Sequence, residues 1–188
     1  NEGSLLVTLS SQNPQVGAGD IAGQAILQSG IIQASKVQFH GDTVTHSGTT
    51  QANSVQVGNY SNFSSTNEDL GTSGSLVANE LSIAGGLSPS SNPSFELSGK
   101  SNQVSSLLIS GTHKDITLRS STTLTVGEAN EREASPIDVS ILDLRVESGD
   151  LKINSEIRSS YSGSVLLAAG KNLIFNRAVL AENYILYS

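Results

Sequence analysis

The chain has 188 residues and a formal net charge of −7, and charged side chains make up only 14% of it. Its 10 Lys and Arg residues are scattered, so no basic patch is present to neutralise phosphates, and nucleic acid is excluded as a partner. Cysteine is absent, which excludes disulfides, thiol nucleophiles and cysteine-based metal sites.

The composition is typical of an extended β structure. Hydrophobic residues make up 36% and aromatic residues 4%, with no Trp, so a core has to be built mainly from Val, Ile, Leu and Ala. Ser, Thr, Asn, Gln and Gly fill the surface in place of charges. No run of about 18 apolar residues is present to span a bilayer as a helix. The chain starts at Asn1 rather than Met, which is typical of a processed product or an excised fragment.

A repeat begins at residue 30. Residues 30–39 read GIIQASKVQF and residues 48–57 read GTTQANSVQV, which match at Gly, Gln, Ala, Val and Gln with an offset of 18 positions. Residues 74–83, GSLVANELSI, form a third copy after a further 26 positions. Within each copy the apolar residues lie two apart, and a two-residue step such as Ser35-Lys36 interrupts the alternation. Each copy is therefore predicted to be two short strands joined by a corner.

The second half continues the alternation in weaker form, with apolar positions two apart over residues 107–126 and 137–146. Two further coils are expected over residues 149–157 and 163–175. The last segment, from Ala178 to Tyr187, reads as an apolar strand without a capping signal, although the end of a solenoid usually needs a polar or irregular cap.

No single copy can bury its own apolar face, so the copies must stack and pair in parallel. The sequence therefore predicts an all-β fold in which residues 1–188 form a single right-handed parallel β-helix, a β-solenoid. Polar, Pro-containing or charged segments are expected to leave the coil as lateral loops at residues 59–73, 87–94 and 128–136.

Two phrases in the second half, GDLKIN at 149–154 and GSVLLAAGKNL at 163–173, resemble the repeats of the filamentous haemagglutinin family. The family consists of exoproteins of two-partner secretion systems. The resemblance extends weakly over most of the chain and is best over residues 149–188. It implies secretion with the help of an outer-membrane transporter, location at the bacterial cell surface and a role in adhesion. It transfers no catalytic residue.

The family's secretion domain carries Asn-Pro-Asn motifs, whereas this chain has Asn13-Pro14-Gln15 and Asn92-Pro93-Ser94. This difference indicates a piece from inside an exoprotein, or a related passenger, rather than the domain that the transporter recognises.

Candidate metal ligands are few. His40, Asp42 and His46 surround one turn, but their spacing matches no zinc signature, so a solvated turn is the favoured interpretation. The third histidine, His113, lies far from them in the sequence. The Gly-rich nonapeptide that binds calcium in β-rolls is absent, as is a phosphate-binding loop. The sequence predicts no metal, no cofactor and no catalytic residue.

Parallel β-helices also include polysaccharide lyases and hydrolases that use carboxylates, so the acidic residues are candidate catalysts. The acidic candidates lie 23, 5 and 7 positions apart, which does not repeat the coil length. An enzyme is therefore the less favoured alternative. The candidate residues are Asp115, Asp138, Asp143 and Asp150, with Lys114, Arg119 and Arg145 as cationic partners.

The leading hypothesis is a secreted structural or adhesive element. Its loops 59–73 and 87–94 are expected to bind a receptor or glycan on a host or neighbouring cell. A second alternative is a filament subunit that associates end to end through its uncapped carboxyl end.

Overall fold

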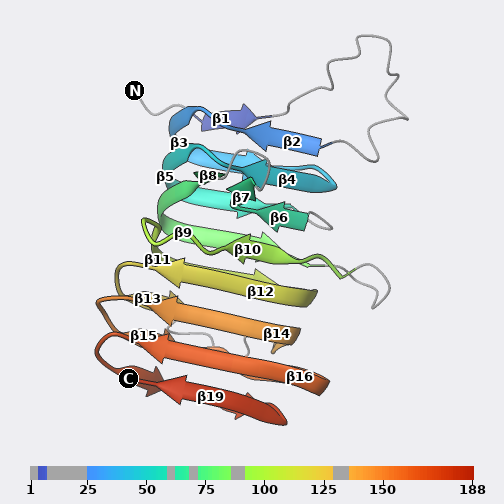
Figure 1. Ribbon diagram of the computed structural model, residues 1–188, viewed down its shortest axis with the longest axis vertical. Helices are drawn as coiled ribbons and strands as arrows, with labels where there is room; N and C mark the ends of the chain where they lie inside the picture. Colours follow the sequence, from blue (N-terminus) through green and yellow to red (C-terminus); the bar gives the residue numbers. More distant parts are fainter. Residues whose placement is uncertain (1–3, 8–24, 59–61, 68–71, 86–91, 129–135) are drawn as a thin grey trace.

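The computed structural model describes residues 4–7, 25–58, 62–67, 72–85, 92–128 and 136–188, and these residues contain strands but no helix (Figure 1). The strands form two parallel sheets, and the chain alternates between them. Each strand pairs with the equivalent strand one coil further on, so the coils stack from β1 and β2 at one end to β19 at the other (Figure 1). The predicted all-β parallel β-helix, or β-solenoid, is confirmed.

The first sheet consists of eight strands. In spatial order they are β1 (Ser4–Val7), β3 (Ile31–Phe39), β5 (Thr49–Val57), β9 (Ser75–Ala84), β11 (Gln103–Ser110), β13 (Leu124–Val126), β15 (Leu151–Ile153) and β17 (Leu173–Phe175).

The second sheet runs beside the first. In spatial order its strands are β2 (Ala25–Gln28), β4 (Thr43–His46), β6 (Asn62–Ser64), β10 (Phe95–Leu97), β12 (Thr112–Ser120), β14 (Ile137–Val146), β16 (Ile157–Ala169) and β18 (Val179–Leu180), and β19 (Asn183–Tyr187) also pairs with β16. A small antiparallel pair, β7 (Thr66–Asn67) and β8 (Thr72–Ser73), lies outside both sheets.

The register confirms the repeat at residues 30, 48 and 74. Ala34 pairs with Ala52, and Ala52 with Ala78, so the same alanine position recurs in three successive coils. The pairing skips Ser35 and Asn53, where the predicted corner falls. The corner bends one continuous strand in each copy rather than separating two strands. The ladder of backbone hydrogen bonds therefore continues on both sides of the bend.

Inward side chains form ladders of apolar residues along the solenoid. Each member lies directly above the equivalent residue of the next coil, which removes both from water and contributes about 25 cal/mol for each Å² of apolar surface buried. In the first sheet the fully buried ladder is Val37, Val55, Leu81, Leu107, Val126 and Ile153. In the second sheet it is Val44, Phe63, Phe95, Ile116, Leu142 and Val165, each at most 2% exposed.

Aromatic rings fill the core near the amino-terminal end. Phe63 and Phe95 belong to paired strands, and their rings stack with centroids 4.9 Å apart and an angle of 16° between planes. Phe39 meets Phe63 edge-on at 5.9 Å, and the ring of His46 stacks on Phe63 at 5.8 Å. These rings supply bulk where the neighbouring coils have valines.

The loop prediction at residues 59–73 is wrong in part. Asn62–Ser64 forms β6, which pairs with β4 and β10 inside the second sheet, because Phe63 fits the inward ladder. Residues 92–94 likewise stack on the coils, since Phe63 N donates to Ser94 O at 2.9 Å and Lys114 N donates to Pro93 O at 3.0 Å. Most of the predicted loops 87–94 and 128–136 lies outside the described residues.

Candidate functional site

A hollow of about 600 Å³ lies on the first sheet, at the corner of four successive coils. We call it the amide groove, because five of its lining side chains are carboxamides. It crosses β3, β5, β9 and β11 and reaches the start of the turn before β13. Its lining residues are Gln33, Ala34, Gln51, Ala52, Asn53, Val77, Ala78, Asn79, Gln103, Ser105 and Thr122.

The repeat itself builds the amide groove. Gln33, Gln51, Val77 and Gln103 are direct partners in the parallel pairing, so this row presents three carboxamides from four consecutive coils. Neighbouring strands lie about 4.8 Å apart, which sets the spacing of the row. Two residues further along each strand, at the corner, lies a second row of polar side chains, which includes Asn53 and Asn79.

Several polar groups of the amide groove are available to a ligand. Gln33 Nε2 donates to Gln51 Oε1 at 3.4 Å, a long contact between two exposed side chains. Within the part of the chain that the structure describes, no side-chain hydrogen bond is made by Asn53, Asn79 or Gln103, all of which are exposed. These carboxamides keep both their donor and their acceptor capacity.

The amide groove has no charged lining residue. Glu80 follows Asn79 in the chain but does not line the groove. Its carboxylate accepts a hydrogen bond from Ser54 Oγ, its strand partner in the preceding coil, at 3.4 Å. Salt bridges among the described residues lie instead on the second sheet and the turns beside it. The two sheets therefore present different chemistry on their outer faces.

The histidine prediction at the turn around residues 40–46 is wrong for one residue. His40 and Asp42 are exposed, as expected of a solvated turn, but His46 is 0% exposed. His46 follows Val44 at a spacing of two, so both side chains enter the core, a periodic signal present in the sequence. No group of three or more His, Asp or Glu side chains that could hold a metal is found among the described residues.

The surroundings of His46 keep its ring neutral. Its Nε2 lies 3.0 Å from Thr50 Oγ1, and its Nδ1 has no hydrogen-bond partner. Burial lowers the pKa of His46 to about 4. His113 is also buried, at the start of β12, with Nε2 3.2 Å from Ser110 O, and burial lowers the pKa of its ring as well. Both histidines therefore belong to the core.

The acidic candidates are only partly brought together. Asp115, Asp138 and Asp143 lie on β12 and β14 of the second sheet. Asp150 precedes β15 of the first sheet, where Asn172 Nδ2 donates to its Oδ1 at 2.9 Å. Lys114 and Asp115 form a loose pair at 3.9 Å. The four carboxyl groups thus do not share one face.

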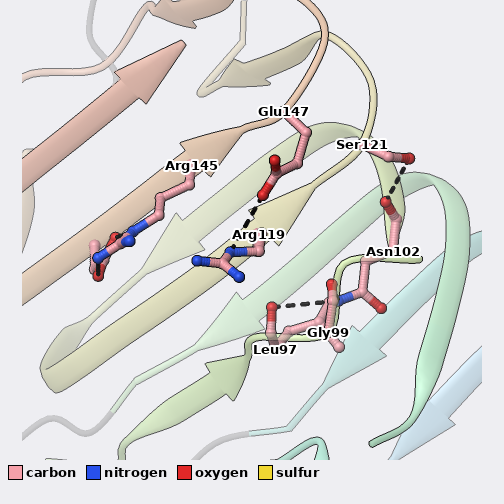
Figure 2. A network of polar contacts seen from close by, with 8 residues as sticks. Leu97, Gly99, Asn102, Arg119, Ser121, Arg145 and Glu147 are labelled. Carbon is pink, nitrogen blue, oxygen red and sulfur yellow. Dashed lines mark hydrogen bonds and ion pairs between the residues drawn. The ribbon is translucent and has the colours of Figure 1, made fainter. Parts of the chain in front are cut away.

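Two arginines spaced by one coil accompany Asp143. Arg145 donates to both carboxylate oxygens of Asp143 at 2.8 Å, and these hydrogen bonds raise the pKa of Arg145. Arg119, the strand partner of Arg145, pairs with Glu147 at 3.4 Å (Figure 2). With Ser98 and Thr117, Asp143 and the two arginines line a hollow of about 330 Å³. Arg119 and Arg145 are 26 positions apart in the sequence, which is the length of one coil here. The spacings of the acidic residues alone do not reveal this pairing.

The carboxyl end of the solenoid exposes the ends of the core ladders. Phe175 extends the ladder of Ile153, and Tyr184 and Leu186 extend those of Val165 and Leu167. These last members are 42%, 64% and 44% exposed, respectively, because no further coil covers them. Together with Arg177, Ala178 and Val179 they line a hollow of about 390 Å³.

Comparisons with protein-family models, with curated proteins and with solved structures found no match for this chain. None of the described residues forms a helix long and apolar enough to cross a membrane. The two stacked parallel sheets and the repeat register alone define the class of this protein: it is a β-solenoid built from a degenerate repeat.

Proposed function

We propose that the chain is a stretch of a secreted structural and adhesive β-solenoid on a bacterial surface, part of a filamentous-haemagglutinin-like exoprotein. The observation that carries the proposal is the unbroken stacking of the core ladders, from Val37 to Ile153 in one sheet and from Val44 to Val165 in the other. Side chains of this kind give a stiff rod rather than an enclosed reaction chamber. The phrases at 149–154 and 163–173 support the family resemblance.

An adhesive rod needs binding groups along its outside. The amide groove offers such groups over four coils, and the segments predicted as loops at 59–73 and 87–94 remain further candidates apart from β6 and residues 92–94, which belong to the coils. Most charged side chains of β12 and β14 form ion pairs, of which that between Asp143 and Arg145 is the shortest. Mutual pairing of this kind favours a surface role for these residues over general acid and base chemistry.

The test is attachment by the purified 188-residue chain. The chain is coupled to fluorescent beads, and retention on cultured animal cells and on neighbouring bacteria is measured against beads carrying the heat-unfolded chain. Saturable retention of the folded chain alone is expected. Equal retention of both bead types, or none, would contradict an adhesive role. Incubation with neutral and acidic polysaccharides tests the enzyme alternative, and shortened or unsaturated products would establish it.

A second candidate function, head-to-tail assembly, is favoured by the exposed ladder ends. Among the described strands, the first sheet ends at β1 and β17, and the second ends at β2 and at β18 and β19. The carboxyl edge of one copy can therefore meet the amino edge of another in the same parallel sense. Such a heterologous contact repeats without closing and gives a filament.

Light scattering against protein concentration tests this assembly. The wild-type chain is expected to grow in size with concentration, and Leu186→Lys is expected to remain monomeric because a buried ammonium would be unpaired at the contact. Lys171→Ala, on an exposed turn residue, is the matched surface control and should assemble like the wild type. A wild-type chain that stays monomeric at every concentration would rule the assembly out.

A further inference from the structure

We infer that the amide groove binds an extended, uncharged glycan laid across the coils, along the axis of the solenoid. This inference rests on the proposed adhesive function and names the ligand class of one surface. It follows from the charge, the hydrogen-bonding capacity and the direction of the groove.

The charge of the groove selects a neutral ligand. Its lining side chains are carboxamides, hydroxyls and small apolar groups, so an anionic ligand would find no cation to offset its loss of hydration. The chain as a whole carries a formal net charge of −7, which further disfavours polyanions through repulsion.

The carboxamides match hydroxyl groups. A carboxamide donates through its nitrogen and accepts through its oxygen, and a sugar hydroxyl can likewise donate and accept. Asn53, Asn79 and Gln103 have this capacity free, and Gln51 accepts only one long hydrogen bond. Ser105 and Thr122 add hydroxyls at the far end of the groove. A ligand rich in hydroxyl groups can therefore satisfy the whole row.

The repetition favours a polymer over a small molecule. The same position contributes Gln33, Gln51 and Gln103 at multiples of the coil spacing, about 4.8 Å for each step. A ligand with similar groups at regular intervals can contact several coils at once, and such multiple contacts add to its affinity.

The direction of the groove disfavours an extended peptide. Peptides that add to a sheet pair with an edge strand through backbone groups. The groove instead crosses β5 and β9, whose backbones already pair with strands on both sides. Recognition there depends on side chains, as neutral glycan binding does.

Isothermal titration of the full 188-residue chain tests the inference. The probes are three neutral hexasaccharides, cellohexaose, maltohexaose and mannohexaose, with hexagalacturonate as the acidic counterpart. The variant Gln51→Ala/Asn79→Ala removes two carboxamides from the groove, and Thr45→Ala removes a polar group from the second sheet as the matched control. Circular dichroism checks that each variant keeps its β-type spectrum.

At least one neutral hexasaccharide is expected to bind saturably. The double variant should bind it about thirtyfold more weakly, since two hydrogen bonds are lost and each contributes about 1 kcal/mol. Thr45→Ala should bind like the wild type. Absence of binding by all three neutral probes, unchanged binding by the double variant, or tighter binding of hexagalacturonate would overturn the inference.

The bead assay separates this inference from the proposed function. If the chain attaches to cells but the double variant attaches equally well and no neutral hexasaccharide binds, the glycan inference fails and adhesion stands. If a neutral hexasaccharide binds through the groove but the chain attaches to no cell, the adhesive function fails and the groove remains a glycan site.

Discussion

Gly30 and Gly48 occupy equivalent positions in two successive coils, yet only Gly48 is enclosed by its neighbours. A Cβ built on Gly48 would collide with Gly30 O and would lie 2.7 Å from Ser29 C, whereas a Cβ on Gly30 would meet nothing within 4 Å. Gly30 O also accepts a hydrogen bond from Thr49 N at 2.9 Å, which fixes the close approach of the two coils. Close packing of the coils therefore requires glycine at position 48 but not at position 30.

Replacing Gly48 with alanine is expected to destabilise the chain by about 1 to 3 kcal/mol, because the backbone of the preceding coil has to move. Gly30→Ala is the matched control and should leave the free energy of unfolding within about 0.5 kcal/mol of the wild type or slightly raise it, since it lowers the entropy of the unfolded chain. Urea unfolding followed by circular dichroism measures both. Equal effects of the two substitutions would contradict the steric explanation.

The solenoid could be predicted because its repeat carries the register in the sequence. The match of Ala34 with Ala52 and Ala78 needs no knowledge of the structure, and the pairing follows from it. The position of β6 could not be predicted in this way. A single inward residue, Phe63, places that short segment in the sheet, and one apolar residue among polar ones is too weak a pattern to detect.

The side chain of Asn102, which is buried, holds the turn between β10 and β11 (Figure 2). Its Nδ2 donates to Gly99 O at 2.6 Å and to Leu97 O at 3.3 Å, and its Oδ1 accepts from Leu76 N at 2.9 Å. Asn102→Ala removes all three side-chain hydrogen bonds to buried backbone groups, so a loss of about 2 to 4 kcal/mol is expected in urea unfolding.

Asn172→Ala is the control for Asn102, because Asn172 makes one exposed hydrogen bond, to Asp150. A change within about 0.5 kcal/mol is expected for it. A similarly small effect at Asn102 would mean that water replaces its hydrogen bonds and that the turn does not depend on the side chain.

Truncating an aromatic side chain is expected to cost more stability in the core, where Phe63 stacks on Phe95, than at the carboxyl end of the solenoid. Phe63 is 2% exposed, so Phe63→Ala should cost about 3 to 5 kcal/mol through lost burial and the cavity left behind. Phe175→Ala, at an aromatic residue that is 42% exposed, should cost about 1 kcal/mol or less. Guanidinium unfolding compares the two, and an equal loss would indicate that the end of the solenoid is covered in solution.

The candidate site was less predictable than the fold. Sequence spacing along one strand does not reveal which outward side chains meet across coils, so the pairing of Arg119 with Glu147 was missed. The amide groove was missed for a related reason. Gln33 and Gln51 are matched positions of the repeat, but Gln103 lies outside its three copies, and the hollow depends on the bend that the corner imposes on the sheet.

The burial of His46 predicts a specific dependence of stability on pH. The folded state holds the pKa of this ring at about 4, whereas an unfolded histidine titrates near 6.5. Between these two values the unfolded chain binds the extra proton, so the free energy of unfolding falls as the pH drops from about 6.5 to about 4. The loss attributable to His46 is on the order of 3 kcal/mol at the acid end of this window.

Urea unfolding at a series of pH values between 4 and 7 measures this slope. His46→Phe keeps an aromatic ring between Phe39 and Phe63 but removes the titrating group, so its slope should be reduced. The slope should not vanish, because burial also lowers the pKa of His113. Val44→Ala is the control: it lowers stability through a core cavity and should keep the wild-type slope. If His46→Phe and Val44→Ala have the same pH profile, protonation of His46 is not what destabilises the solenoid in acid.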